Sequence, residues 1–339
     1  MGTRDKNVDS LRGIACILLV TVHVVHSTAV PNGWALWYGD AFIGIRMPLF
    51  AFLSGVVYAW RPVTSPGLWP SFIANKARRL LIPYVILVPI LAISHLVLEI
   101  GAAPSANPVG WFLFPQSPYW FLLASFWVYA AVALADSHRL LERRRNVAWL
   151  FAALLALNVV VNLHAGSHPP FLRLTSALYL ALYFVAGMAA IRFGWRYVSR
   201  RVALGTAALF LALFLYVQAI PLGAWTFHDN PRQDLVQIAL AISFPLAFMA
   251  LRLQSSALAW IGGYSAGIYL LHPFTMVTGR AILHLVGVES TAVDVLFTSA
   301  VSLFGAVLGV TVMRRFALGR VTLGERVKVP ARIVRRDDA

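Results

Sequence analysis

The sequence of 339 residues lacks much of what marks a water-soluble enzyme. Only 12% of its residues are charged, the acidic residues number 13, and Cys16 is the single cysteine. A lone cysteine excludes a disulfide within the chain, and in an apolar segment it is most simply a small core residue. There is no Gly-x-Gly-x-x-Gly fingerprint, P-loop, Gly-x-Ser-x-Gly elbow or zinc-spaced Cys or His pair. The sequence therefore contains no motif that would predict a metal site or a dinucleotide site.

Long apolar runs are present instead, because 60% of the residues are hydrophobic. About 20 apolar residues span a bilayer, and such stretches must be helical because lipid offers no partner for backbone N–H and C=O groups. We therefore predict an all-α, polytopic integral membrane protein. Its ten expected transmembrane helices run roughly over residues 10–28, 38–59, 80–99, 118–135, 147–163, 173–191, 202–220, 232–251, 258–279 and 292–313.

The 28 basic residues give the chain a net charge of +15, which could indicate a nucleic-acid partner. If the N-terminus is cytoplasmic, however, 24 of the 28 lie on the cytoplasmic side of the ten-span arrangement. The positive-inside rule thus explains the basicity without nucleic acid and predicts that both termini are cytoplasmic. We expect a multi-pass protein of the cytoplasmic (inner or plasma) membrane, with one ten-helix domain over residues 1–313 and a basic cytoplasmic tail over 314–339.

The first span carries Arg12 at its start and His23 eleven residues later. Eleven residues of α-helix make about three turns and rise about 16 Å, so the two side chains share one face at different depths. A titratable group inside the bilayer is costly, which favours a catalytic role for His23 over that of a hydrogen-bonded core residue. For Asp9 and Ser10, which precede the span, capping of the helix is at least as good an interpretation as a role beside Arg12.

Polar residues also mark the second and third spans. Arg46 lies inside the second span, after Asp40 and before Ser54. Three cations stand at the cytoplasmic start of the third span, where they are either positive-inside anchors or, together with Arg12, a site for a phosphorylated ligand. These cations are Lys76, Arg78 and Arg79.

In the ninth span, Ser265, Tyr269 and His272 stand at positions i, i+4 and i+7, which places them in one polar stripe of a helix. Hydrogen bonding between helices and a direct role in binding substrate explain this stripe equally well. Trp120 opens the fourth span at the outer surface, where an aromatic belt is the favoured explanation.

Together these segments resemble the acyltransferase-3 family of integral membrane enzymes, and they occur in the family's order along nearly the whole chain. Arg46-Met47-Pro48-Leu49-Phe50 is most similar to the sugar O-acetylase branch of that family. In the expected Arg-x-x-Arg pair, Lys76 occupies the first place. The similar segments are Asp9-Ser10-Leu11-Arg12-Gly13-Ile14-Ala15 followed by His23, Arg46 to Leu53-Ser54-Gly55, the basic cluster before Pro83, Trp120-Phe121-Leu122, and Ile268-Tyr269-Leu270-Leu271-His272-Pro273.

The resemblance implies a membrane O-acyltransferase that moves an acyl group, with acetyl expected, from cytoplasmic acyl-CoA to a hydroxyl of an extracytoplasmic glycan or lipid-linked sugar. The family's essential Arg and His correspond to Arg12 and His23. The cations at the cytoplasmic mouth would bind the CoA phosphates, and no metal is expected. The rise from Arg12 to His23 is about the length that an extended pantetheine arm must cover.

In this scheme His23 is the general base on the acceptor hydroxyl, and either Arg46 or His272 stabilises the thioester oxyanion or orients the sugar. Direct transfer and an acyl-His23 intermediate both remain open. A transporter or flippase, in which the same buried groups line a substrate path, is the alternative. The residues expected to contact substrate or support the site are Asp9, Asp40, Ser54, Trp120, Ser265 and Tyr269.

Overall fold

The computed structural model of the chain describes residues 5–27, 33–98, 105–115, 118–160, 171–219 and 235–327. All regular structure in these residues is helical. The α-helices are α1 (Lys6–His26), α2 (Gly33–Ala59), α3 (Trp69–Leu98), α4 (Pro108–Leu113), α5 (Trp120–Ser137), α6 (Arg144–Val160), α7 (Leu174–Arg192), α8 (Arg200–Ala219), α9 (Leu235–Ala250), α10 (Ser256–Gly263), α11 (Ser265–Leu285), α12 (Thr291–Met313) and α13 (Ala317–Thr322). Three short 3-10 helices are η1 (Pro66–Leu68), η2 (Phe171–Arg173) and η3 (Trp195–Tyr197).

The prediction of an all-α polytopic membrane protein is confirmed. Among the described residues, 7 helices are long and apolar enough to cross a membrane, and α9 is a shorter apolar helix. In the described residues, each of the ten predicted windows overlaps helical structure. The ninth does not form a single helix, because the chain breaks at Tyr264 between α10 and α11. The count of ten spans and the cytoplasmic placement of the termini remain predictions.

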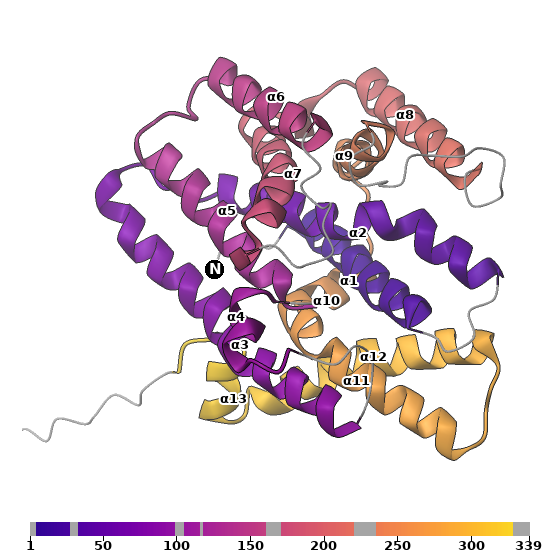
Figure 1. Ribbon diagram of the computed structural model, residues 1–339. Helices are drawn as coiled ribbons and strands as arrows, with labels where there is room; N and C mark the ends of the chain where they lie inside the picture. Colours follow the sequence, from indigo (N-terminus) through magenta and orange to yellow (C-terminus); the bar gives the residue numbers. More distant parts are fainter. Residues whose placement is uncertain are drawn as a thin grey trace, which may run out of the picture.

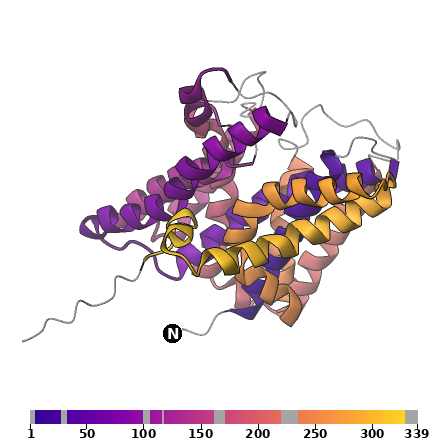
Figure 2. The same ribbon diagram turned by 90° about the horizontal axis from the view of Figure 1, so that it is seen from below.

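The helices form a bundle in which α1 and α2 occupy the middle (Figure 1). α1 packs against α10 and α2, and α2 packs against α7. α11 and α12 run side by side as a hairpin, as both views show (Figure 2), and α8 and α9 form a second pair. α3 lies against α5. This arrangement puts residues from α1, α2 and α11 next to one another, although they are far apart in the sequence.

Two glycines allow α2 and α7 to cross at close range. A methyl group at Gly55 of α2 would overlap the backbone carbonyl of Phe184, and one at Gly187 of α7 would overlap that of Phe52. Small residues at such crossings let helix backbones approach, which supplies packing energy where lipid removes the hydrophobic drive. The crossing fixes the position of α2, which carries Arg46.

α12 ends at Met313, and the predicted boundary between the helical domain and the basic tail stays a prediction. The described part of this segment is not extended, because α13 folds back and packs against α3 and α12. Arg326 then donates to Asn75 Oδ1 of α3 at 2.8 Å. Residues 328–339 of the tail lie outside the described residues.

Candidate functional site

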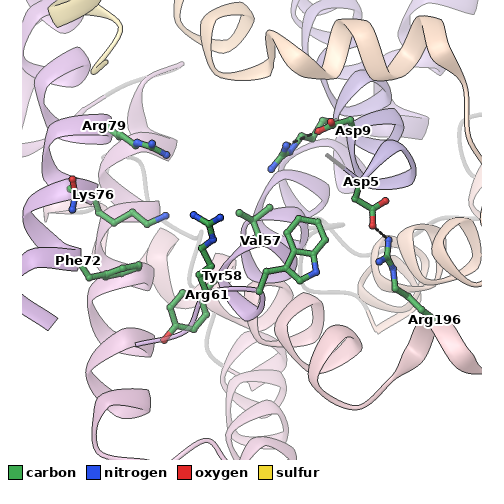
Figure 3. A pocket seen from close by; sticks show the side chains of 12 residues that line it. Asp5, Asp9, Val57, Tyr58, Arg61, Phe72, Lys76, Arg79 and Arg196 are labelled. Atoms are coloured by element: carbon green, nitrogen blue, oxygen red, sulfur yellow. Dashed lines mark hydrogen bonds and ion pairs between the residues drawn. The ribbon is translucent and has the colours of Figure 1, made fainter. Parts of the chain in front are cut away.

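A charged cavity lies between the start of α1, the end of α2, the first half of α3 and η3. Its volume of about 800 Å³ is in the range of small-molecule pockets, which hold about 300–1,000 Å³. Figure 3 shows Lys76 and Arg79 reaching into it from one side toward Arg61, with Asp5, Asp9 and Arg196 on the other side. The lining residues are Asp5, Asp9, Arg12, Val57, Tyr58, Trp60, Arg61, Phe72, Asn75, Lys76, Arg79 and Arg196.

Cations outnumber carboxylates in this cavity, so it favours an anionic ligand. Two of the five cations have carboxylate partners: Arg12 Nη1 lies 2.8 Å from Asp9 Oδ1, and Arg196 forms an ion pair with Asp5. Within the described part of the chain, no carboxylate pairs with the other three, which are Arg61, Lys76 and Arg79. Planar guanidinium groups and a mobile ammonium group are the donors that bind phosphates in proteins.

The start of α1 explains how Asp9 and Arg12 come to face the cavity. Asp5 caps the helix, because its Oδ1 accepts from the backbone N–H groups of Asn7 (3.0 Å) and Val8 (3.2 Å). The capping interpretation of Asp9 and Ser10 is therefore wrong, since both lie inside the helix. Asp9 is instead the partner of Arg12 one turn on, and Ser10 Oγ accepts from the backbone N–H of Ser255 at 3.0 Å, which fastens α1 to the start of α10.

The three cations of the predicted third span separate in the structure. α3 begins at Trp69, so these residues stand two turns inside the helix and not ahead of it. Lys76 and Arg79 line the cavity. Arg78 is on the side facing the C-terminal segment, where its backbone lies against Gly324 and its guanidinium and that of Arg326 are both near Asn75 Oδ1.

A second polar cluster lies about 16 Å further along α1, three turns beyond Arg12. The ring centroids of His23 on α1 and His272 on α11 are 5.0 Å apart, and Arg46 Nη1 on α2 is 3.3 Å from His23 Nδ1. His272 is buried and His23 half-buried. Three helices thus bring together the three residues that the sequence marks as catalytic candidates.

Backbone hydrogen bonds orient both imidazole rings. His23 Nδ1 lies 2.8 Å from the carbonyl oxygen of Leu19, and His272 Nδ1 lies 2.8 Å from that of Tyr269. Because a carbonyl can only accept, we assign the proton to Nδ1 in each ring, which leaves the lone pair of a neutral imidazole on Nε2. An Nε2 lone pair is what a general base needs.

The His-Pro sequence explains the hydrogen bond of His272. Proline has no N–H, so Pro273 leaves the carbonyl of Tyr269, four residues earlier, without its usual helical partner. His272 Nδ1 takes that place, and the carbonyl of His272 itself accepts from Ser302 Oγ of α12 at 3.0 Å. The ring is therefore oriented by its own helix, while the backbone of His272 is tied to α12.

Arg46 has a different relation to His23. Since His23 Nδ1 already donates to Leu19, the guanidinium at 3.3 Å is a positive charge beside the ring and does not donate to it. The guanidinium thus brings a positive charge from α2 to the histidine pair.

The residues predicted to contact substrate or support the site lie at different places in the helix bundle. The Tyr269 hydroxyl donates to the carbonyl of Pro118, and Tyr119 donates to that of Leu270 at 2.7 Å, so α11 is tied to the start of α5. Ser265 is the first residue of α11, about 10 Å along the axis from His272. The Arg173 guanidinium lies over the Trp120 ring, 5.8 Å from the ring centroid.

Asp40 and Ser54 lie on α2 on either side of Arg46. Asp40 is exposed. Ser54 is half-buried, about 12 Å along the axis from Arg46, and its carbonyl accepts from Tyr129 at 3.4 Å. The structure therefore places Ser54 toward the cavity side of the bundle. For Asp40, we find no contact with the histidine pair among the described residues.

Sequence reasoning missed an ion-pair network beside the cavity. Buried Asp136 of α5 accepts from the Tyr58 hydroxyl at 2.7 Å and from Arg192 Nη1 at 2.8 Å. It also missed the ion pair of Asp5 with Arg196. Burial lowers the pKa of the Arg196 guanidinium, and the charge of Arg252 lowers it further. In the sequence, Arg192 and Arg196 fit the positive-inside rule and show no sign of a carboxylate partner. For Asp136, the available signal is a lone acidic residue directly after the fourth predicted span.

Comparison with known proteins gives a match over most of the chain. The model of a family described as an acyltransferase domain, the third of that name, matches residues 5–313. No curated protein and no solved structure matches the chain. The matched range begins at the capping residue of α1 and ends with the last residue of α12, so it includes the cavity and the histidine pair.

Proposed function

Because the chain belongs to the acyltransferase-3 family and is a multi-pass membrane acyltransferase, we propose that its donor is acyl-CoA and its acceptor a hydroxyl of an extracytoplasmic glycan or lipid-linked sugar. Acetyl is the expected acyl group, as in the sugar O-acetylase branch. One observation carries the proposal: a single continuous helix, α1, holds Arg12 in the wall of a cationic cavity and His23 in contact distance of His272.

The cavity suits the nucleotide end of CoA, which carries several phosphate charges. Arg61, Lys76 and Arg79 supply the excess positive charge, and Arg12 lines the cavity from α1. From there the pantetheine arm would extend toward the histidine pair, about 16 Å away. In this proposal the cavity opens to the cytoplasm, which agrees with the prediction from the basic residues that both termini are cytoplasmic.

The proposed chemistry follows from the ring orientations. His23 Nε2 removes the proton of the acceptor hydroxyl, whose oxygen attacks the thioester carbonyl, and the carbon–sulfur bond breaks to release the CoA thiolate, which receives a proton in turn. Neutral His272, with Nδ1–H bound to the backbone, has no further donor for an oxyanion. Arg46 is therefore the proposed oxyanion donor, and His272 Nε2 is placed to accept a hydrogen bond from the acceptor.

Transfer of label from acetyl-CoA tests this function. Membrane vesicles that contain the protein are given acetyl-CoA labelled in the acetyl group, and surface glycans are analysed by mass spectrometry with and without the gene. We expect an ester-linked label on glycan or lipid-linked sugar, released by mild alkali. Movement of substrate across the membrane without any new ester would instead identify a transporter.

A further inference from the structure

The ammonium group of Lys76 is held by aromatic rings. Its Nζ lies 3.3 Å from the ring centroid of Tyr129 on α5 and 5.3 Å from that of Phe72, one turn earlier on α3. Both distances are within the range of about 6 Å in which the negative face of a ring attracts a cation. We call Tyr129 and Phe72 the lysine cradle.

The cradle itself is fixed from behind. Tyr129 is buried, its ring meets Phe184 edge-on with centroids 5.0 Å apart, and its hydroxyl donates to the Ser54 carbonyl. Tyr58 packs against both cradle rings, and its hydroxyl donates to buried Asp136, which is paired with Arg192. The rings are therefore set by contacts that do not involve Lys76.

The aromatic contacts hold the flexible side chain of Lys76 in one position before a ligand binds. Its four-carbon stem is flexible, and ordering it costs side-chain entropy whenever it must meet a ligand. Tyr129 covers one side of the ammonium group, so the remaining N–H groups are directed into the cavity, toward which Figure 3 shows the side chain extending.

From this arrangement we propose that Tyr129 is a positioning residue for the acyl donor: it holds the Lys76 ammonium group in place to bind a donor phosphate. The inference rests on the proposed function and deepens it, because it assigns a role to a residue of α5 that does not line the cavity. Tyr129 acts through its ring face. Its hydroxyl donates to the Ser54 carbonyl.

The experiment measures the Kd of CoA by titration calorimetry on the purified protein in nanodiscs. Tyr129→Phe keeps the ring face and should bind CoA within about twofold of the wild type, whereas Tyr129→Leu should raise the Kd about threefold to thirtyfold, the range expected for a cation–π contact. Donor KM should rise in parallel, while kcat at saturating donor stays the same. Phe210→Leu on α8, where the ring contacts Phe214 and Phe244, is the matched control for loss of an aromatic ring.

The double variant decides whether Tyr129 acts through Lys76. Lys76→Met should weaken CoA binding, and adding Tyr129→Leu to it should cause no further loss. An unchanged Kd in Tyr129→Leu, or the same fold loss with and without Lys76, would overturn the inference. An unchanged Kd in Lys76→Met would instead count against the proposed donor site itself.

A shape-preserving replacement covers the case in which Tyr129→Leu does not fold. Phenylalanine at position 129 is compared with a trifluorinated phenylalanine, which has nearly the same shape but a ring face with little negative charge. We expect the Kd of CoA to rise on fluorination in the presence of Lys76 and to stay constant in the Lys76→Met background. Equal affinity of the two ring types with Lys76 present would refute the proposal.

Discussion

The rings of His23 and His272 lie 5.0 Å apart, and each Nδ1 is hydrogen-bonded to a backbone carbonyl of its own helix. Both rings thus present Nε2 as an acceptor. We predict that His272→Ala lowers kcat for acyl transfer about tenfold to hundredfold, less than the full effect of removing a general base. His272→Gln, whose amide can still donate within α11, should retain more activity. Wild-type kcat in a folded His272→Ala protein would reduce His272 to a core residue.

Removal of the cavity arginines should weaken donor binding. Arg12→Ala and Arg79→Ala each delete a charged hydrogen-bond donor, so we expect the Kd of CoA to rise about tenfold to hundredfold. Arg78→Ala is the matched control, because Arg78 lies on the same helix as Arg79 but does not line the cavity. Calorimetry with CoA checks this, and equal effects at positions 78 and 79 would show that general surface charge, not the cavity, binds the donor.

The crossing of α2 and α7 should not tolerate even a methyl group. Gly55→Ala and Gly187→Ala would each push a Cβ into a backbone carbonyl of the other helix, and we expect a loss of about 1–3 kcal/mol in the free energy of unfolding. Gly205→Ala on α8 has open space around its Cβ and should be neutral or slightly stabilising. Thermal unfolding in detergent measures the difference, and equal stability of all three variants would contradict the close crossing.

The predicted membrane orientation can be tested by cysteine labelling. Cys16 is buried and should give little background. An impermeant thiol reagent added outside should label cysteines placed near Pro104, His168 and His228, which lie outside the described residues, and should not label positions 144 and 196. The reverse pattern would place the cationic cavity on the wrong side for cytoplasmic acyl-CoA.

Much of the fold was predictable because the bilayer leaves a sequence few choices. Apolar windows of membrane length located every long helix, and the spacing of Arg12 and His23 on one helix was correct. The break at Tyr264 was not predicted, since it lies inside a single, largely apolar window of membrane length, 258–279. Hydropathy averages over a window and does not register where a backbone turns.

The site was predictable only where one residue is unusual in its own segment. His23, Arg46 and His272 are polar groups in apolar helices, and the structure brings them together. Arg196 could not be told from an ordinary cytoplasmic anchor, because its partner, Asp5, is distant in the sequence. Lys76 and Arg78 differ by only two positions, about 200° around α3, and the structure alone shows which of them faces the cavity.

We propose that His23 acts on the acceptor hydroxyl and not on the nucleotide. Its most direct test is the His23→Ala variant, with acetyl transfer from labelled acetyl-CoA and the Kd of CoA measured on the same preparation. We predict that transfer falls at least about a hundredfold, while the Kd stays within about twofold of the wild type because the cavity is three turns away. A folded His23→Ala protein that transfers acetyl at the wild-type rate would show that His23 is not the general base.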